Sequence, residues 1–327
     1  MDPLLSFWQY CRPFEGAGKP WPPLPLPAST TELWWREWAA NTAAGEVWTQ
    51  LQRQLPQLLI APATGARSSE AYQSLVVRGQ EPNTNNYMQA PQLQDPEGFR
   101  LSIAEQASGA VPVIDVRNRR DFELLVRCLA HRCEPVELQP SVHAQAIAGL
   151  IHWGLIREVD PSARCQLLIL HQAPYSSLQA SMVPGQRDAQ EWLQNSHRWR
   201  LAHELTHIAC TRLLGEMRIN LYDELLADAV GMLASLGRFE AELFRLALGL
   251  SPTGELQPGG RAKAYVGRLE PEVHVQAYRA VLQRAAELER LLATGRLSRE
   301  PMPLLQQLGQ QRLDHPLQVK TSSLKRE

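Results

Sequence analysis

The chain has 327 residues, with 33 Lys plus Arg, 34 Asp plus Glu and a formal net charge of −1. A hydrophobic content of 44% and a charged content of 20% are typical of a globular protein and exclude a disordered one. Because there is no basic excess, we expect neither nucleic acid nor an anionic membrane surface as a partner. No stretch reaches the roughly 18 apolar residues that span a bilayer.

The five cysteines are odd in number and form no CxxC pair, so they do not predict a disulfide framework. The start, "MDPLLSFWQYCRPFEG", lacks the basic and apolar regions of a signal peptide. We therefore expect a cytoplasmic protein with no membrane association.

The first third of the chain is rich in proline and tryptophan. Residues 1–28 are expected to run extended over the surface. A helix with the sequence "ELWWREW" follows Ser29, Thr30 or Thr31 as its cap. Its three tryptophans could bind an aromatic group, but their spacing favours helix packing. The polar loop at 80–98 is the expected boundary of an N-terminal region, residues 1–98.

The middle of the chain predicts a small α/β unit, followed by a mainly helical half. The expected strands are 99–106, 111–116, 135–138 and 165–172, and the expected helices are 119–132, 141–156, 189–214, one that begins after Asn220, and 271–293. The fold class is therefore α+β. We expect a metal-binding core at 99–250 and a C-terminal helical segment with a flexible tail at 251–327.

The stretch "LAHELTHIAC" places His203 and His207 four residues apart on one predicted helix. Residues at i and i+4 share a helix face, so both imidazoles can point at one metal ion. Zinc binds imidazole nitrogen, and a catalytic zinc site needs three protein ligands and an open position. Glu204 lies one residue round the helix, where its carboxylate can take a proton from a metal-activated water.

The next predicted helix supplies a third ligand. "NLYDELLADAVGM" carries Glu224, 17 residues after His207, and Asp228 one turn later. Glu224 is the candidate oxygen ligand, and Asp228 is the candidate acceptor for a free ring N–H of a ligand histidine. Asn220 and Asp223 have the spacing of a helix cap and its partner.

Together, "HELTH" and "ELLAD" resemble the motifs of the glutamate-ligand zincins, the gluzincin metallopeptidases, and the short gap between them resembles the ImmA/IrrE-type peptidases. The resemblance covers roughly residues 198–235. It implies a Zn²⁺ ion on His203, His207 and Glu224, Glu204 as the general base, Asp228 as a support, and a peptide or protein substrate.

The sequence departs from that pattern in one position and leaves one role open. Asp223 replaces the usual asparagine before the third ligand. The residue that stabilises the oxyanion is not identified by a motif. The candidates by position are Tyr175, Arg218, His274, Tyr265 and Tyr278.

Four further alternatives stay open. The strand at 165–172 either pairs with extended substrate at a sheet edge or is a buried core strand. Cys210 is expected to be a buried apolar filler rather than a ligand. The main alternative to an enzyme is a non-catalytic zinc-containing regulatory or protein-interaction module. A regulatory protease with one specific partner is a third reading.

Overall fold

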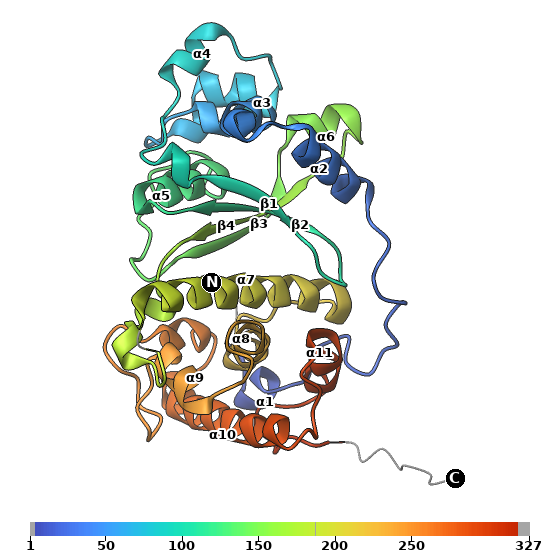
Figure 1. Cartoon of the computed structure of the whole chain (residues 1–327), viewed down its shortest axis with the longest axis vertical. Coiled ribbons are helices and arrows are strands. Elements are labelled where there is room, and N and C mark those ends of the chain that lie inside the picture. The colour runs from blue at the N-terminus through green and yellow to red at the C-terminus, as the bar shows by residue number, and fades with distance from the viewer. Residues whose placement is uncertain (1–3, 187, 320–327) are drawn as a thin grey trace. The chain divides into compact units, whose positions relative to one another are not determined.

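The computed structural model describes residues 4–186 and 188–319, and the chain divides into two compact units. We name them the sheet unit, residues 23–173, and the helical unit, formed by the segments up to residue 22 and from 174 onward. Figure 1 shows the sheet with helices of its own in the first half of the chain and a helical second half. The predicted α+β fold class is confirmed. The unit limits differ from the expected boundaries at 98 and 250, because segments distant in sequence pack into the same unit.

The sheet unit is built on four strands in the order β1-β2-β4-β3. β2 and β4 run parallel at the centre, and the two outer strands are antiparallel to their neighbours. Because β4 is paired on both sides, it has no open edge for an extended peptide, and the core-strand alternative for this segment is correct. The strands are β1 Arg100–Ala104, β2 Val111–Val116, β3 Ala144–Leu150 and β4 Cys165–His171.

The expected helix at 141–156 is wrong. Its first part is β3, which pairs with β4, and Gly149 (φ 74°) lies in an irregularity between Ile147 and Leu150. Its second part is the short helix α6, which His152 caps. Cross-strand pairing overrode a spacing of apolar residues that also suits a helix. The short strand expected at 135–138 is irregular chain.

Five helices complete the sheet unit. One apolar cluster joins α2, α3, α5 and α6 to the sheet, and Trp35 is 1% exposed within it. A single turn of π-helix, Tyr72–Val77, lies between α3 and α4. The helices are α2 Thr30–Asn41, α3 Val47–Gln54, α4 Thr84–Gln89, α5 Arg119–Leu129 and α6 Trp153–Glu158.

The helical unit contains the two helices that carry the metal-site motif. The long helix α7 begins at the cap Asp188 and ends at Gly215, as expected, and α8 begins at the cap Asn220. The helices are α1 Phe7–Tyr10, α7 Ala189–Leu214, α8 Leu221–Leu236, α9 Ala241–Leu248, α10 His274–Ala293 and α11 Pro301–Gly309.

The N-terminal segment does not run extended on the surface as expected. α1 forms, and Tyr10, Cys11 and Phe14 are buried in the core of the helical unit. The Tyr10 hydroxyl accepts from the backbone N–H of Leu221 (2.9 Å), at the start of α8. The aromatic side chains of this segment gain more from burial than the chain loses by ordering.

α7 and α8 pack closely at Gly231. A Cβ atom there would lie 2.3 Å from Cδ1 of Trp199 and 2.8 Å from its carbonyl oxygen. Only glycine allows this approach, because any side chain at residue 231 would collide with α7. The crossing holds the first turn of α8 beside the middle of α7.

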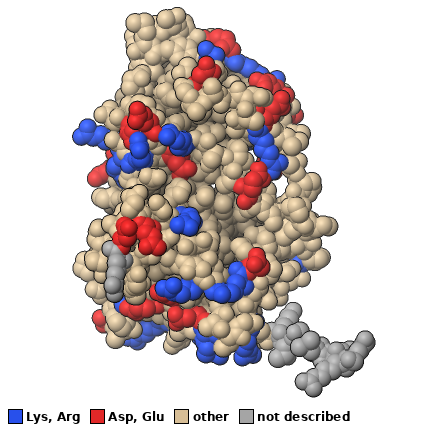
Figure 2. Space-filling view, viewed as in Figure 1, with Lys and Arg blue, Asp and Glu red and all other residues tan. Residues whose placement is uncertain are grey.

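The surface carries both signs of charge. Figure 2 shows Lys and Arg interspersed with Asp and Glu on the viewed face, without a large area of one sign. Within the described residues, no helix combines the length and the apolar character that a membrane crossing requires.

His152 is a buried titratable group in the sheet unit. It is 0% exposed, and its Nδ1 accepts the backbone N–H of Leu155 (3.1 Å). Its ring meets Trp34 and Trp35 edge-on at 4.9 and 5.0 Å. Burial lowers the pKa of His152 from 6.5 to about 3, so the folded protein keeps this ring neutral.

This burial predicts an acid-sensitive sheet unit. Between pH 6.5 and about 3 the unfolded chain binds a proton at His152 that the folded chain does not. The stabilisation that comes from the neutral His152 ring is therefore complete above pH 6.5. As the pH drops below this value, the free energy of unfolding falls by about 1.4 kcal/mol per pH unit. Urea unfolding at pH 7 and pH 5 should show this loss in the wild type and a smaller one in His152→Asn, which can still cap α6. Equal losses in the two proteins would contradict it.

Candidate metal centre

The ends of α7 and α8 bring the motif residues together. Gly215 adopts the left-handed conformation (φ 80°) that ends α7 and lets the chain reverse. The Asn220 side chain then accepts the N–H groups of Tyr222 and Asp223 at 3.1 and 2.9 Å, which starts α8. Glu224 consequently lies in the first turn of α8.

His203, His207 and Glu224 converge on one point. The two Nε2 atoms are 3.0 Å apart. The Glu224 carboxylate lies 3.6 Å from Nε2 of His203 and 3.4 Å from Nε2 of His207. All three side chains are buried, with exposed fractions of 5%, 8% and 3%. Within the described residues, these three form the only group of possible metal ligands of this kind.

The separations suit a small tetrahedral cation. Zinc bonds to nitrogen and oxygen ligands of about 2.0–2.1 Å place neighbouring ligand atoms about 3.4 Å apart. The three observed separations lie within about half an ångström of that value. The ligand atoms therefore need little movement to hold such an ion.

Each histidine has its own carboxylate behind it. Nδ1 of His203 lies 2.8 Å from Oδ1 of Asp228. Nδ1 of His207 lies 3.3 Å from Oδ2 of Asp223, close but without an aligned hydrogen bond. A carboxylate at Nδ1 favours the tautomer with its proton on that nitrogen, which leaves the Nε2 lone pair free.

With those tautomers, the three ligand groups are all acceptors. Two Nε2 lone pairs face the Glu224 carboxylate, whose buried Oε2 makes no hydrogen bond and has an ion pair with Nη1 of Arg261 at 3.5 Å. Acceptors cannot satisfy one another, and a buried unsatisfied carboxylate oxygen is costly. A cation bound by all three groups removes this cost, so the residues present fit a metal ion.

The charges around the centre favour a cation as well. Three carboxylates, those of Asp223, Glu224 and Asp228, face one guanidinium, that of Arg261, so two negative charges remain if both imidazoles are neutral. Burial opposes the charge on His207, but Asp223 and Glu224 outweigh it and raise the pKa of His207 well above 6.5. The field that favours a proton there also favours a divalent metal ion.

Asp228 is the most heavily bonded group of the centre. It is 0% exposed. Besides Nδ1 of His203, Oδ1 accepts from Nε1 of Trp199 (3.0 Å) and from the Tyr175 hydroxyl, and Oδ2 accepts from Arg261. Although burial raises the pKa of an acid, Arg261 and His203 outweigh it and hold the pKa of Asp228 well below its usual range.

Glu204, the candidate base, is half-buried on α7 next to His203. Its carboxylate makes no hydrogen bond to any other described residue. Arg200 lies one turn earlier on α7. Burial lowers the pKa of Arg200 to about 10, and the charge of Glu204 partly opposes that shift. A general base needs a carboxylate that is not held in such hydrogen bonds.

Four of the five residues considered for the oxyanion role lie elsewhere. The Tyr175 hydroxyl contacts Nδ1 of His203 (3.0 Å), on the side away from the ligand atoms. The Arg218 guanidinium donates to the carbonyls of the N-terminal segment, residues 10 and 12. Nε2 of His274 lies 3.0 Å from the carbonyl oxygen of Leu269. Tyr278 is a core residue with 3% exposure.

Tyr265 is the tyrosine that reaches Glu224. Burial and the Glu224 carboxylate, which hydrogen-bonds to the hydroxyl, hold the pKa of Tyr265 well above 10. Arg261 stands beside it, with Nη1 3.5 Å from Oε2 of Glu224. Sequence reasoning missed Arg261, because the loop and short 3-10 helix that carry it have no periodicity and no motif.

No cysteine is in the group of possible metal ligands, although Cys210 lies beside Asp223. Cys210 is 0% exposed, and burial raises the pKa of its thiol, in agreement with a filler role. Cys128 and Cys133 are buried thiols in the sheet unit that contact backbone carbonyls.

The bonding of Asp228 leads to a prediction. Asp228→Asn removes the charge that neutralises the partly buried Arg261, so we expect a loss of about 3 kcal/mol in the free energy of unfolding. Metal affinity should fall roughly 10- to 100-fold, because His203 loses its partner. Urea unfolding and metal titration measure both. Glu242→Gln, which removes an exposed ion pair of the same unit, should cost less than about 1 kcal/mol. Equal effects of the two substitutions would contradict the prediction.

Comparison with known proteins places the chain by its family alone. No curated protein matches it, and no solved structure matches it. One family model matches residues 21–164 and 160–313, which is most of the chain. The protein therefore belongs to DUF7005, a family of unknown function.

Proposed function

We propose that this protein is a zinc-dependent hydrolase, and most specifically a metallopeptidase. One observation carries the proposal: two imidazole Nε2 atoms and a carboxylate converge in a buried site while an aspartate stands behind each imidazole. The resemblance of "HELTH" and "ELLAD" to the gluzincin motifs supports the peptidase class. A bound zinc ion supplies Lewis acidity, which lowers the pKa of water and polarises a carbonyl.

In this proposal the residues of the centre have separate roles. His203, His207 and Glu224 hold the ion, and Asp228 and Asp223 orient the two histidines. Glu204 takes the proton of the attacking water and returns it to the leaving amine of the peptide. A structural site has no need of a free carboxylate at this position, so Glu204 supports catalysis over a purely structural role.

Tyr265 and Arg261 are the proposed donors to the developing oxyanion. Both contact Glu224, and both are partly exposed, so they border the side from which substrate can approach. A hydroxyl and a guanidinium both donate hydrogen bonds to negative oxygen. They replace Tyr175, Arg218 and His274 in this role.

The first test is metal content. We expect about one zinc ion per chain in the gently purified wild type and a loss of at least tenfold in His207→Ala, because two ligands hold the ion poorly. Elemental analysis after dialysis measures this, and circular dichroism shows whether the variant is folded. A matched control is His197→Ala, since His197 lies on α7 outside the ligand group. A folded wild type without metal, or one unchanged by His207→Ala, would overturn the metal site.

The second test is turnover. Zinc-loaded wild type should cleave a casein-like substrate or members of a peptide library, and Glu204→Gln should bind zinc equally but lose roughly 100-fold or more in rate. Equal rates in the two zinc-loaded proteins would reject Glu204 as the base. No cleavage of any peptide by the zinc-loaded wild type would favour the non-catalytic zinc module, whose metal removal should then unfold the helical unit.

A further inference from the structure

The sheet unit has a pocket of its own on its helical layer. It lies between α2, α3 and α6 and has a volume of about 400 Å³. Pockets of about 300–1,000 Å³ are typical of small-molecule sites. None of its lining residues belongs to the helical unit, so any ligand here is independent of the metal centre.

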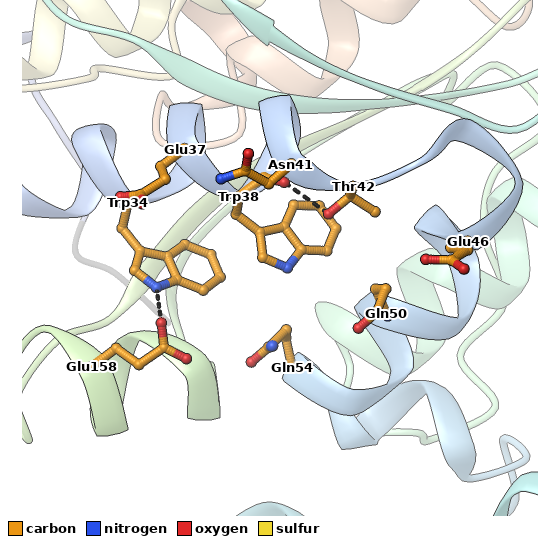
Figure 3. Close-up of a pocket in the computed structure, with 9 residues that line it drawn as sticks. All are labelled: Trp34, Glu37, Trp38, Asn41, Thr42, Glu46, Gln50, Gln54 and Glu158. Atoms are coloured by element: carbon orange, nitrogen blue, oxygen red, sulfur yellow. Dashed lines mark hydrogen bonds between the residues drawn. The ribbon is translucent and has the colours of Figure 1, made fainter.

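Two tryptophans form one wall. Trp34 and Trp38 lie one turn apart on α2, and their rings are nearly parallel, 13° apart, with centroids separated by 6.1 Å. Figure 3 shows both indoles pointing from α2 into the pocket. Trp35 turns the other way and is buried in the core. Trp35 therefore packs in the core, as expected, whereas Trp34 and Trp38 form a partly exposed aromatic surface.

Polar groups line the rest of the pocket, and three of them are acidic. Glu37, Glu46 and Glu158 come from three separate elements, and no Lys or Arg is among the residues that line the pocket. One carboxylate oxygen of Glu158 accepts Nε1 of Trp34 (2.7 Å). Among the described residues, Glu37 and Glu46 form no ion pair. Three carboxylates around one pocket repel one another, and a cationic ligand relieves that repulsion.

The approach of α6 to this wall depends on a glycine. A Cβ at Gly154 would lie 2.2 Å from Oε1 of Gln54 and 2.8 Å from the Trp34 ring. Because that space is kept clear, Glu158 can reach Trp34, and the amide of Gln54 can stand at the pocket. The close packing at Gly154 thus brings Glu158 into contact with Trp34.

We infer that this pocket binds an organic cation, an ammonium or guanidinium group on an apolar stem, with the carboxylates of Glu37, Glu46 and Glu158 and the indole surfaces of Trp34 and Trp38. Indole faces attract cations through the ring quadrupole, and the stem gains from contact with the rings. A neutral sugar would also stack on indole, but it would leave the three carboxylates uncompensated. An anion would be repelled. The cation is either a Lys or Arg side chain of a peptide or a free polyamine, which share this chemistry.

Calorimetric titration of the full-length protein tests the inference. The probes are spermidine, a blocked tripeptide with a central arginine, the same tripeptide with a central glutamine, and maltose as a neutral sugar. We expect saturable binding of at least one cationic probe, weakened by added salt, and no binding of the glutamine tripeptide or maltose. Binding of the arginine tripeptide alone identifies a basic peptide as the source, and binding of spermidine alone identifies a polyamine.

Two variants decide whether the binding occurs in this pocket. Glu37→Gln with Glu46→Gln should weaken the cation roughly tenfold or more, and Glu97→Gln, an exposed carboxylate of the sheet unit outside the pocket, should change it less than about twofold. Both glutamates of the double variant are exposed and have no structural bond, so the variant should unfold at the wild-type temperature. No saturable binding of either cation, preferential binding of maltose, or equal effects of the two variants would overturn the inference.

Discussion

The buried carboxylate of Asp228 is the interaction on which the helical unit and its candidate site both depend. Removing a charge from water is expensive unless it is paired and hydrogen-bonded. Here the charge is paired with Arg261 and hydrogen-bonded to His203, Trp199 and Tyr175. These partners come from α7, from the segment before it and from the loop after α9. Loss of any of these partners would leave part of the charge uncompensated, and the bond to Nδ1 directs the Nε2 side of the His203 ring toward Glu224.

The second aspartate explains why a departure from the zincin pattern is compatible with a metal site. Asp223 accepts the backbone N–H groups of Arg218 and Ile219 at 3.0 and 3.3 Å, which holds the turn between α7 and α8. Its carboxylate also faces Nδ1 of His207. An asparagine could hold the turn, but it would not add negative charge behind the ring. With two aspartates behind two histidines, the centre has an excess of negative charge, which a divalent cation balances.

The sequence was most informative where the relevant contacts are local. His203 and His207 share a helix face because of the 3.6-residue period, and Asn220 and Gly215 mark helix ends through their own backbone and side-chain chemistry. Those features place Glu224 one turn into α8. Where contacts are distant, the same reasoning failed. The segment at 141–156 has an apolar spacing that suits a helix, and its pairing with β4 made the first half a strand. Tyr10 and Phe14 were expected on the surface, and they are buried by helices more than two hundred residues later in the chain.

The sequence by itself determined the α+β class, the two motif helices, and the three residues proposed as ligands, since each follows from helix period, capping or strand-length apolar runs. Only the tertiary structure decided the surroundings of those ligands. Arg261 and Tyr265 come from a loop without periodicity. The Tyr175 hydroxyl donates a hydrogen bond to Asp228, which holds it on the Nδ1 side of His203. The division of the tryptophan triplet between the core and a pocket is also tertiary. Adjacent residues on a helix point in different directions, and only the packing of α3 and α6 decides which direction is open.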